Sequence, residues 1–468
     1  MDLLGRHPGG RVALIEPGHG ERVTYGELAE RVDAAARQLR PAAGGPGLAF
    51  LAMEPDVDAV VLYLACLRAR LPLCLAEPQA EPLARLAAVY EPELLLLPAA
   101  LVPPPDYSEE PSPVPRYRVW AGGPAVSRPT HPDLALLLTT SGSTGNPKLV
   151  RLSARNLAAN ARSIAAYLEL GPEERAVESL AMHYSYGLSV LNSHLLAGAS
   201  VVLTPHSFLR PEFWAIVDAE RFTSFAGVPY MYETLHRLRF DPARHPALRT
   251  LTQAGGALRR DLAAHFHELA GRAGARFFVM YGQTEATARI SYVPPEMLGS
   301  KLGTIGVPIP DGHLSLAPVE GSGDLMELVY QGPNVMLGYA DSAADLALGD
   351  VQGGVLRTGD LGSVDADGFF SVVGRLKRFA KLFGRRVSLE DVERDVETTF
   401  PARVAATDGG DRLVLHAELD GAVRPEDVGG HVAKQLGVPP GAVSVVVVPS
   451  LPRTASGKKD YRALEVAR

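Results

Sequence analysis

Cysteine is scarce in this sequence. Only Cys66 and Cys74 occur among 468 residues, which excludes a disulfide-stapled secreted fold and suggests no metal site. The N-terminal sequence MDLLGRHPGG lacks the basic start and apolar stretch of a signal peptide. We therefore expect two packed thiols in a reducing cytosol, and a cytoplasmic protein.

Long apolar runs and an excess of positive charge are also missing. No uninterrupted apolar run reaches the roughly 18 residues that suggest a membrane span. The net charge is −7, which argues against nucleic acid as the main partner. Hydrophobic residues make up 46% and charged residues 21% of the chain, so there is ample material for a large core. The length permits two or more domains.

Strand-like and helical patterns alternate along the chain. Residues 23–39 place apolar side chains at helical spacing, with Thr24 as N-cap and Glu27 completing a capping box. The apolar run 134–138 predicts a buried strand, and the Pro-rich segment 103–115 predicts an exposed connection. Further helices are expected over 57–73 and 156–168, and further strands over 200–203, 223–227, 412–419 and 442–448. The alternation predicts an α/β fold of layered sheets and helices with buried parallel strands.

A loop of small and hydroxyl residues follows the strand expected over 134–138. Residues 139–150 read TTSGSTGNPKLV, with Lys148 adding a cation after an Asn-Pro turn. Such a loop can bring backbone N–H groups and hydroxyls to a polyphosphate, because glycine allows close backbone approach. It is not a Walker A loop, since Gly145 and Lys148 are not adjacent. Taken alone, a loop of this composition is more often a surface turn.

Five motifs, in order, resemble those of the adenylate-forming superfamily. They are TTSGSTGNPK from Thr139, YGQTEAT from Tyr281, RTGDLG from Arg357, GRLKRFAKLFGRRVSLEDVE from Gly374 and PRTASGKKDYRAL from Pro452. The superfamily includes acyl-CoA synthetases, adenylation domains of non-ribosomal peptide synthetases and firefly luciferase. The resemblance covers nearly the whole chain. It implies a large N-terminal domain over 1–376 that binds acid and ATP, and a small mobile α+β domain over 377–468.

The resemblance also implies roles for charged residues. A carboxylate must attack a negative phosphate, so the reaction needs Mg²⁺, cations and oriented donors. Lys458 is the expected catalytic lysine, although Lys459 is adjacent. Thr284 is expected to contact the AMP phosphate, and Glu285 to hold Mg²⁺ together with Thr144. Contacts to ATP are expected from Thr140, Ser141, Gly142, Ser143, Thr144, Gly145, Lys148, Gly255, Gly256, Tyr281, Gly282, Gln283, Asp360 and Arg375.

Two motifs supply the residues expected at the ribose and at the domain junction. An ionised carboxylate has only acceptor sites, so Asp360 suits both ribose hydroxyls, with Arg375 as a second contact and Tyr281 stacking on adenine. A basic cluster begins at Arg375, and a solvated face is its ordinary meaning. Lys377 occupies the hinge position, where many superfamily members have Asp and luciferase-like members have lysine.

The acid is expected to bind between several segments. His183 resembles the aromatic gate residue of acyl-CoA synthetases, so the resemblance implies a gating role for it. Substrate contacts are expected from Tyr184, Ser185, Tyr186, Gly187, Gly227 and Val228. Ser185 stands where amino-acid adenylation domains carry the Asp that pairs with an ammonium group. A buried ammonium without a carboxylate would be costly. A neutral aliphatic or aromatic acid of unknown chain length therefore fits better than an α-amino acid.

The leading hypothesis is an acid–thiol ligase. ATP and a small carboxylic acid give acyl-AMP, and a pantetheine thiol of CoA or of a separate acyl carrier protein takes the acyl group. The motifs leave open transfer to an amine, or nitrite-dependent diazotisation of an aromatic amine. A non-catalytic nucleotide-binding protein is disfavoured because Lys148, Glu285, Asp360 and Lys458 are all present.

Overall fold

The fold is described from a computed structural model that covers most of the chain. The described residues are 3–5, 7–39, 47–122, 129–139, 148–319, 325–376, 378–382, 385–410, 412–454 and 458–466. They form two compact units: unit 1 comprises Met1–His313 and Gln331–Leu356, and unit 2 comprises Leu314–Tyr330 and Arg357–Arg468. The junction expected at Lys377 lies outside the described residues, so a domain boundary at 376/377 stays a prediction.

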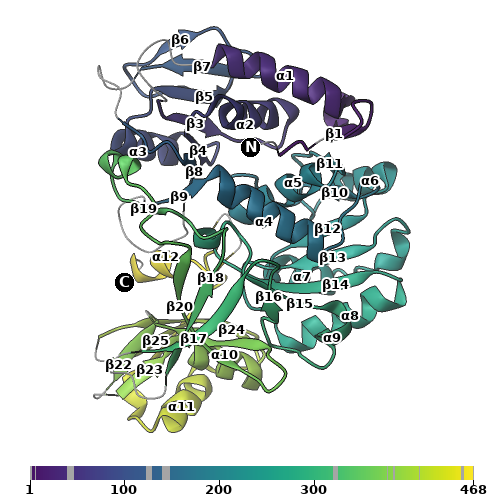
Figure 1. The fold of residues 1–468 in the computed structure, drawn as a ribbon. Coiled ribbons are helices and arrows are strands. Elements are labelled where there is room, and N and C mark those ends of the chain that lie inside the picture. Colours follow the sequence, from purple (N-terminus) through teal and green to yellow (C-terminus); the bar gives the residue numbers. More distant parts are fainter. Residues whose placement is uncertain are drawn as a thin grey trace. The chain divides into compact units, whose positions relative to one another are not determined.

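Unit 1 contains two large sheets (Figure 1). The first runs in the order β19 (Gly338–Ala340), β9 (Leu149–Ser153), β8 (Leu134–Thr139), β4 (Leu73–Ala76), β3 (Ala49–Ala52), β5 (Leu94–Pro98), β7 (Tyr117–Ala121), β6 (Ser108–Glu110). The second runs β16 (Val307–Pro308), β15 (Ser291–Val293), β14 (Arg276–Tyr281), β13 (Thr250–Gln253), β12 (Ser224–Gly227), β10 (Arg175–Val177), β11 (Ser200–Val202), β1 (Val12–Glu16), β2 (Glu21–Thr24). The central strands of both sheets are parallel and the outer ones antiparallel.

Helices cover these sheets, which confirms the α/β prediction. They are α1 (Tyr25–Gln38), α2 (Val57–Ala69), α3 (Ala80–Tyr90), α4 (Ala154–Tyr167), α5 (Ser185–Leu196), α6 (Pro211–Glu220), α7 (Pro229–Arg237), α8 (Arg260–Arg272) and α9 (Pro295–Leu298). Helices α4 and α5 lie between the two sheets (Figure 1). The Tyr167 ring of α4 stacks on Tyr292 of β15 at 4.3 Å, and the Tyr63 hydroxyl of α2 lies 3.1 Å from Asn192 of α5.

Local sequence signals account for several elements of unit 1. Thr24 caps α1 and Glu27 closes the predicted capping box. Helix α2 is shorter than the expected 57–73, because Arg70 takes a left-handed conformation (φ 57°) and ends it. Segment 103–115 is largely exposed, as expected, yet includes the edge strand β6. Cys66 and Cys74 are buried free thiols.

Unit 2 is built from smaller sheets. Its elements are β17 (His313–Pro318), β18 (Met326–Gln331), β20 (Val355–Val364), β21 (Phe370–Arg375), β22 (Phe379–Leu382), β23 (Arg385–Ser388), α10 (Leu389–Thr399), β24 (Ala402–Asp408), β25 (Leu413–Leu419), α11 (Pro425–Leu436), β26 (Val443–Val447) and α12 (Tyr461–Val466). One apolar cluster joins α10 and α11 to the sheet β24–β25–β26 through residues such as Val396, Leu415 and Val432.

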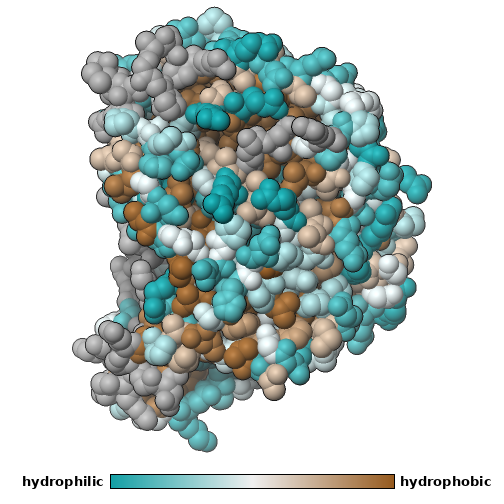
Figure 2. All heavy atoms as spheres, viewed as in Figure 1, coloured by the Kyte–Doolittle hydropathy of each residue, from teal (hydrophilic) through white to brown (hydrophobic). Residues whose placement is uncertain are grey.

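The face of the molecule drawn in Figure 2 has a mixed character. On this face, hydrophobic and hydrophilic residues are interspersed. Across the described part of the chain, none of the helices has both the length and the apolar character needed to cross a membrane.

Candidate active site

Of the predicted phosphate loop, the structure describes Thr139 at its start and Lys148 with the residues after it. Lys148 Nζ lies 3.7 Å from Asp341 Oδ2 and 3.9 Å from the centre of the Tyr339 ring. The pairing of β9 with β19 explains this, because it sets Ala340 opposite Leu149 and so brings a distant segment beside Lys148. Residues 140–147 lie outside the described part of the chain, and with them the expected ATP contacts Thr140, Ser141, Gly142, Ser143, Thr144 and Gly145.

Tyr339 connects Lys148 to the expected magnesium ligand. Its hydroxyl donates to Glu285 Oε1 at 2.8 Å, and the Met336 N–H donates to the Glu285 carbonyl at 2.9 Å. The expected phosphate cation and the expected magnesium carboxylate are therefore neighbours. No cluster of three or more His, Cys, Asp and Glu offers another metal site within the described ranges.

The YGQTEAT motif forms a tight turn after β14 that includes the 3₁₀ helix η3 (Thr284–Ala286). A Cβ on Gly282 would lie 1.9 Å from the Ala288 carbonyl oxygen, so only glycine fits there. Ala288 itself has φ 113°, a conformation that L-residues seldom adopt. The buried Asn334 amide donates to the Ala286 carbonyl at 2.8 Å and holds the turn in place. The motif thus presents Thr284 and Glu285 on a fixed backbone.

The start of α5 meets this turn. Ser185 Oγ lies 3.1 Å from Thr284 Oγ1, and either hydroxyl can donate. Ser185 is buried, whereas Thr284 is half-buried. A residue expected to contact the acid is therefore in direct contact with one expected to contact the AMP phosphate.

Three further predicted residues come together behind this contact. Gly255 has φ +86°, and a Cβ there would lie 2.7 Å from the Tyr184 hydroxyl and 3.2 Å from Val228 Cγ1. The buried Tyr186 hydroxyl donates to the Thr252 carbonyl at 3.0 Å. Close contacts would also block a Cβ on Gly187 and Gly227, and a Cβ on Gly256 would lie 3.2 Å from the Pro229 ring.

His183 precedes α5 and is half-buried. Burial lowers the pKa of its imidazole to about 4, although the Met53 backbone acts in the opposite direction. The ring is therefore neutral at neutral pH. Its Nδ1 atom is buried and has no hydrogen-bond partner among the described residues. The gate role of His183 stays a prediction.

The two residues expected at the ribose lie in unit 2, where they pair with each other. Asp360 of β20 stands opposite Arg375 of β21. Arg375 Nε lies 2.8 Å from Asp360 Oδ1, and the carboxylate is buried. The Asp360 N–H donates to Thr358 Oγ1 at 3.1 Å. Sheet register thus fixes the orientation of the Asp360 carboxylate.

Of the two adjacent lysines near the C-terminus, Lys459 is held by carboxylates of unit 2. Lys459 Nζ lies 2.9 Å from both Glu393 Oε2 and Glu397 Oε1, and also donates to the Val404 carbonyl. The Lys458 carbonyl accepts from the Thr454 N–H at 2.9 Å.

Several residues of the site were missed by sequence reasoning. Tyr339 and Asp341 lie outside the quoted motifs, and only the β9–β19 pairing brings them to Lys148. Asn334 acts through backbone carbonyls that a sequence cannot reveal. Arg289 is the second residue after the YGQTEAT motif, yet nothing in its local pattern indicates that it is buried.

Comparison with known proteins gives a family match. Residues 4–340 match the family described as AMP-binding enzyme. Feruloyl-CoA synthase from Amycolatopsis sp. is 31% identical over 404 residues, covering 81% of this chain and 78% of that protein. Oxalate–CoA ligase from Arabidopsis thaliana is 30% identical over 356 residues, covering 71% of this chain and 67% of that protein.

A solved structure has the same fold. O-succinylbenzoate coenzyme A synthetase from Bacillus subtilis, in complex with ATP and magnesium ion, aligns with a TM-score of 0.76 at 23% identity. The alignment covers 97% of this chain and 96% of that one. Together with the family match, it confirms the superfamily and the fold that the motifs predict.

Proposed function

This chain belongs to the AMP-binding enzyme family, and from that premise we propose that it activates a carboxylic acid with ATP and passes the acyl group to a thiol. The acid's oxygen attacks the α-phosphorus of ATP, the bond to pyrophosphate breaks, and acyl-AMP forms. A pantetheine thiol then attacks the acyl carbon, giving a thioester and AMP while the thiol proton is released. CoA is the first acceptor to test, because the relatives named above include a CoA synthase and a CoA ligase.

One contact carries this proposal. Ser185 on the acid side and Thr284 on the phosphate side are 3.1 Å apart, so an acid held at α5 has its carboxylate next to the expected phosphate position. Bringing the two reacting groups together in this way removes much of the entropic barrier to reaction. Thr284 is fixed by the turn around Gly282 and Asn334, which keeps that donor preorganised.

Magnesium fits the residues at this position. Mg²⁺ takes one or two protein carboxylates together with substrate phosphates, and Glu285 offers a carboxylate whose Oε1 already accepts from Tyr339. When bound, the ion supplies Lewis-acid charge stabilisation to the phosphate oxygens. Tyr339 orients the carboxylate, and Lys148 adds positive charge beside the same ring.

Lys458 is proposed as the lysine that stabilises charge building on the α-phosphate and the carboxylate. The alternative, Lys459, holds two carboxylates of unit 2 at 2.9 Å and is engaged in the fold. The use of Lys459 in the fold, together with the motif resemblance, supports Lys458.

Asp360 is proposed as the ribose acceptor. An ionised carboxylate can accept from several donors, so the ion pair with Arg375 is compatible with contacts to both hydroxyls. The hinge role of Lys377 is part of the same proposal and rests on the motif resemblance alone.

The test separates the two half-reactions. We expect acid-dependent release of pyrophosphate in a panel of mono- and dicarboxylic acids, followed by thioester formation when CoA or a phosphopantetheinylated carrier protein is added. Asp360→Ala should weaken ATP binding by about 10-fold or more, as expected for loss of a charge-assisted bond, with binding measured by calorimetry.

Two results would revise the proposal. Acyl-AMP formation without any thioester would move the function to amine chemistry, whereas no pyrophosphate with any acid would exclude acid activation altogether.

A further inference from the structure

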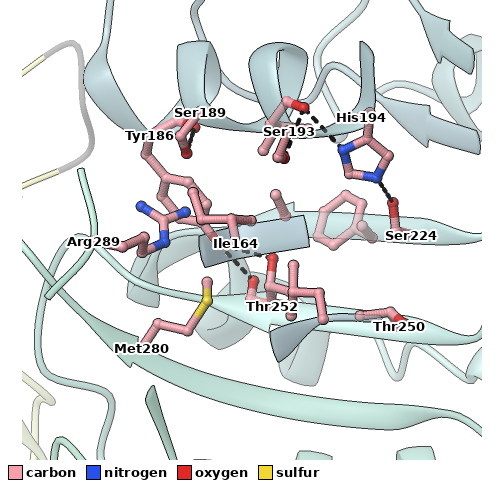
Figure 3. A pocket seen from close by; sticks show the side chains of 14 residues that line it. Ile164, Tyr186, Ser189, Ser193, His194, Ser224, Thr250, Thr252, Met280 and Arg289 are labelled. Carbon is pink, nitrogen blue, oxygen red and sulfur yellow. Dashed lines mark hydrogen bonds between the residues drawn. The ribbon is translucent and has the colours of Figure 1, made fainter. Parts of the chain in front are cut away.

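A small cavity lies within unit 1, between α5 and the strands of the second sheet. Its volume is about 20 Å³, enough for roughly one water molecule. Figure 3 shows Arg289 and Tyr186 together at one end, and His194 with Ser224 at the other. The lining is mixed, since Ile164 and Met280 are apolar whereas both ends carry hydrogen-bonding groups.

Arg289 is the unusual member of this lining. Its residue is only 3% exposed, and its guanidinium stacks on the Tyr186 ring at 3.9 Å. One Nη atom donates to the Ala288 carbonyl at 3.3 Å, and the Tyr167 phenol lies beside it. The Nε atom is buried without a hydrogen-bond partner, and no carboxylate of the described residues pairs with the charge.

The buried Arg151 and the half-buried Arg378 have partners of other kinds. Arg151 is fully buried and donates to backbone carbonyls of residues 337–349. Arg378 lies 2.7 Å from Glu393. A buried charge without such compensation is costly, so a ligand that supplies the missing anion would gain strongly from contact with Arg289.

The position of Arg289 identifies which ligand that is. Tyr186, on which it stacks, follows Ser185 directly in α5, and Ser185 contacts Thr284. The reacting carboxylate proposed at Thr284 and the cation at Arg289 therefore both lie beside the first turn of α5. The cavity holds only about one water molecule, so a carboxylate reaches Arg289 by displacing that water and moving side chains of the lining.

We propose that Arg289 binds a second anionic group of the acid, and that the substrates are short acids with a distal carboxylate or sulfonate. The inference rests on the proposed function and specifies its substrate class. It replaces the neutral acid expected from the sequence. It also gives a second reason why an α-ammonium group is disfavoured, since the pocket already holds a cation.

The test uses acids that differ only in the second charge. Succinate is compared with butyrate, and malonate with propionate, by kcat/KM for pyrophosphate release and by calorimetric titration. We expect the wild type to prefer each dicarboxylate by about 10²-fold, the size of a charge-assisted contact. Arg289→Met should abolish that preference while changing the monoacid values little, and Arg289→Lys should retain part of it.

Controls separate a binding role from a packing role. Arg272→Met alters an exposed arginine at the end of α8 and should leave the preference intact. An equal fall in dicarboxylate and monoacid values for Arg289→Met would mean that Arg289 only packs against Tyr186, and would overturn the inference.

The same experiment distinguishes this inference from the proposed function. Pyrophosphate release with monoacids but not dicarboxylates would overturn only the role of Arg289. Arg289-dependent binding of succinate without pyrophosphate release would support Arg289 and reject the acid activation. Absence of both binding and release with every acid would reject both.

Discussion

Two groups of buried charge in this protein are built in opposite ways. In unit 2, the buried Glu393 carboxylate lies 2.7 Å from Arg378 and 2.9 Å from Lys459, and also accepts from the Ala406 N–H. In unit 1, the buried Arg289 cation has an aromatic ring and a backbone carbonyl beside it, but no carboxylate among the described residues. The first group is complete in the free protein, and the second is not.

This difference indicates two roles for buried charge. The group around Glu393 stabilises the fold, and Arg289 is proposed to bind a ligand. Buried ion pairs persist when each partner satisfies the other, and removing one partner is strongly destabilising. A buried charge without an ion-pair partner lowers the stability of the fold. Such destabilising features are expected at functional sites.

The largest effect is expected from breaking the complete group. Lys459→Met leaves Glu393 and Glu397 without their shared cation, so the free energy of unfolding of unit 2 should fall by about 3–5 kcal/mol. Scanning calorimetry measures it. Lys434→Met, at an exposed position in the last turn of α11, is the matched control. A loss no greater than that of the control would show that Lys459 is not structural.

The next effect concerns catalysis by the neighbouring lysine. Lys458→Ala should slow acyl-AMP formation by about 10²–10³-fold, as for loss of one transition-state donor, while ATP binding is largely retained. Single-turnover pyrophosphate release is the measurement, with Lys434→Ala as control. Near-normal adenylation by Lys458→Ala would show that Lys458 is not the catalytic lysine.

A smaller effect is expected at the magnesium ligand. Tyr339→Phe keeps the ring beside Lys148 but removes the hydroxyl that orients Glu285. The Mg²⁺ concentration for half-maximal adenylation should rise by about 10-fold, as for the loss of a residue that orients a metal ligand. An unchanged Mg²⁺ dependence would show that Tyr339 has no role in magnesium binding.

The smallest effect is in the pH dependence of stability. Burial would raise the pKa of the Glu393 carboxyl, but the Lys459 and Arg378 cations hold it below its ordinary value of 4.5. A lowered folded-state pKa gives stability that is present above about pH 4.5 and lost as the pH falls through the folded value. Glu393→Gln should therefore flatten the acid limb of the unfolding curve. An identical acid limb in wild type and variant would contradict this.

How much the sequence can predict depends on how local each feature is. The α1 capping box needs only Thr24 and Glu27, three residues apart, and the structure has it. The expected roles of the site residues came from motifs, and each motif covers only a short segment of the chain. The placement of Tyr339 beside Lys148 and Glu285 depends on pairing between β9 and β19, far apart in the chain. The burial of Arg289 likewise follows from packing between α5 and the second sheet, which no local pattern encodes.

The central claim is that Arg289 is incomplete in the free protein because its partner is the substrate. Arg289→Met replaces an uncompensated buried cation with an apolar side chain, so it should leave the stability of unit 1 unchanged or raise it. Scanning calorimetry without ligand, compared with Lys459→Met, measures this most directly. A loss of stability for Arg289→Met as large as that for Lys459→Met would contradict the account, because it would make Arg289 part of the fold.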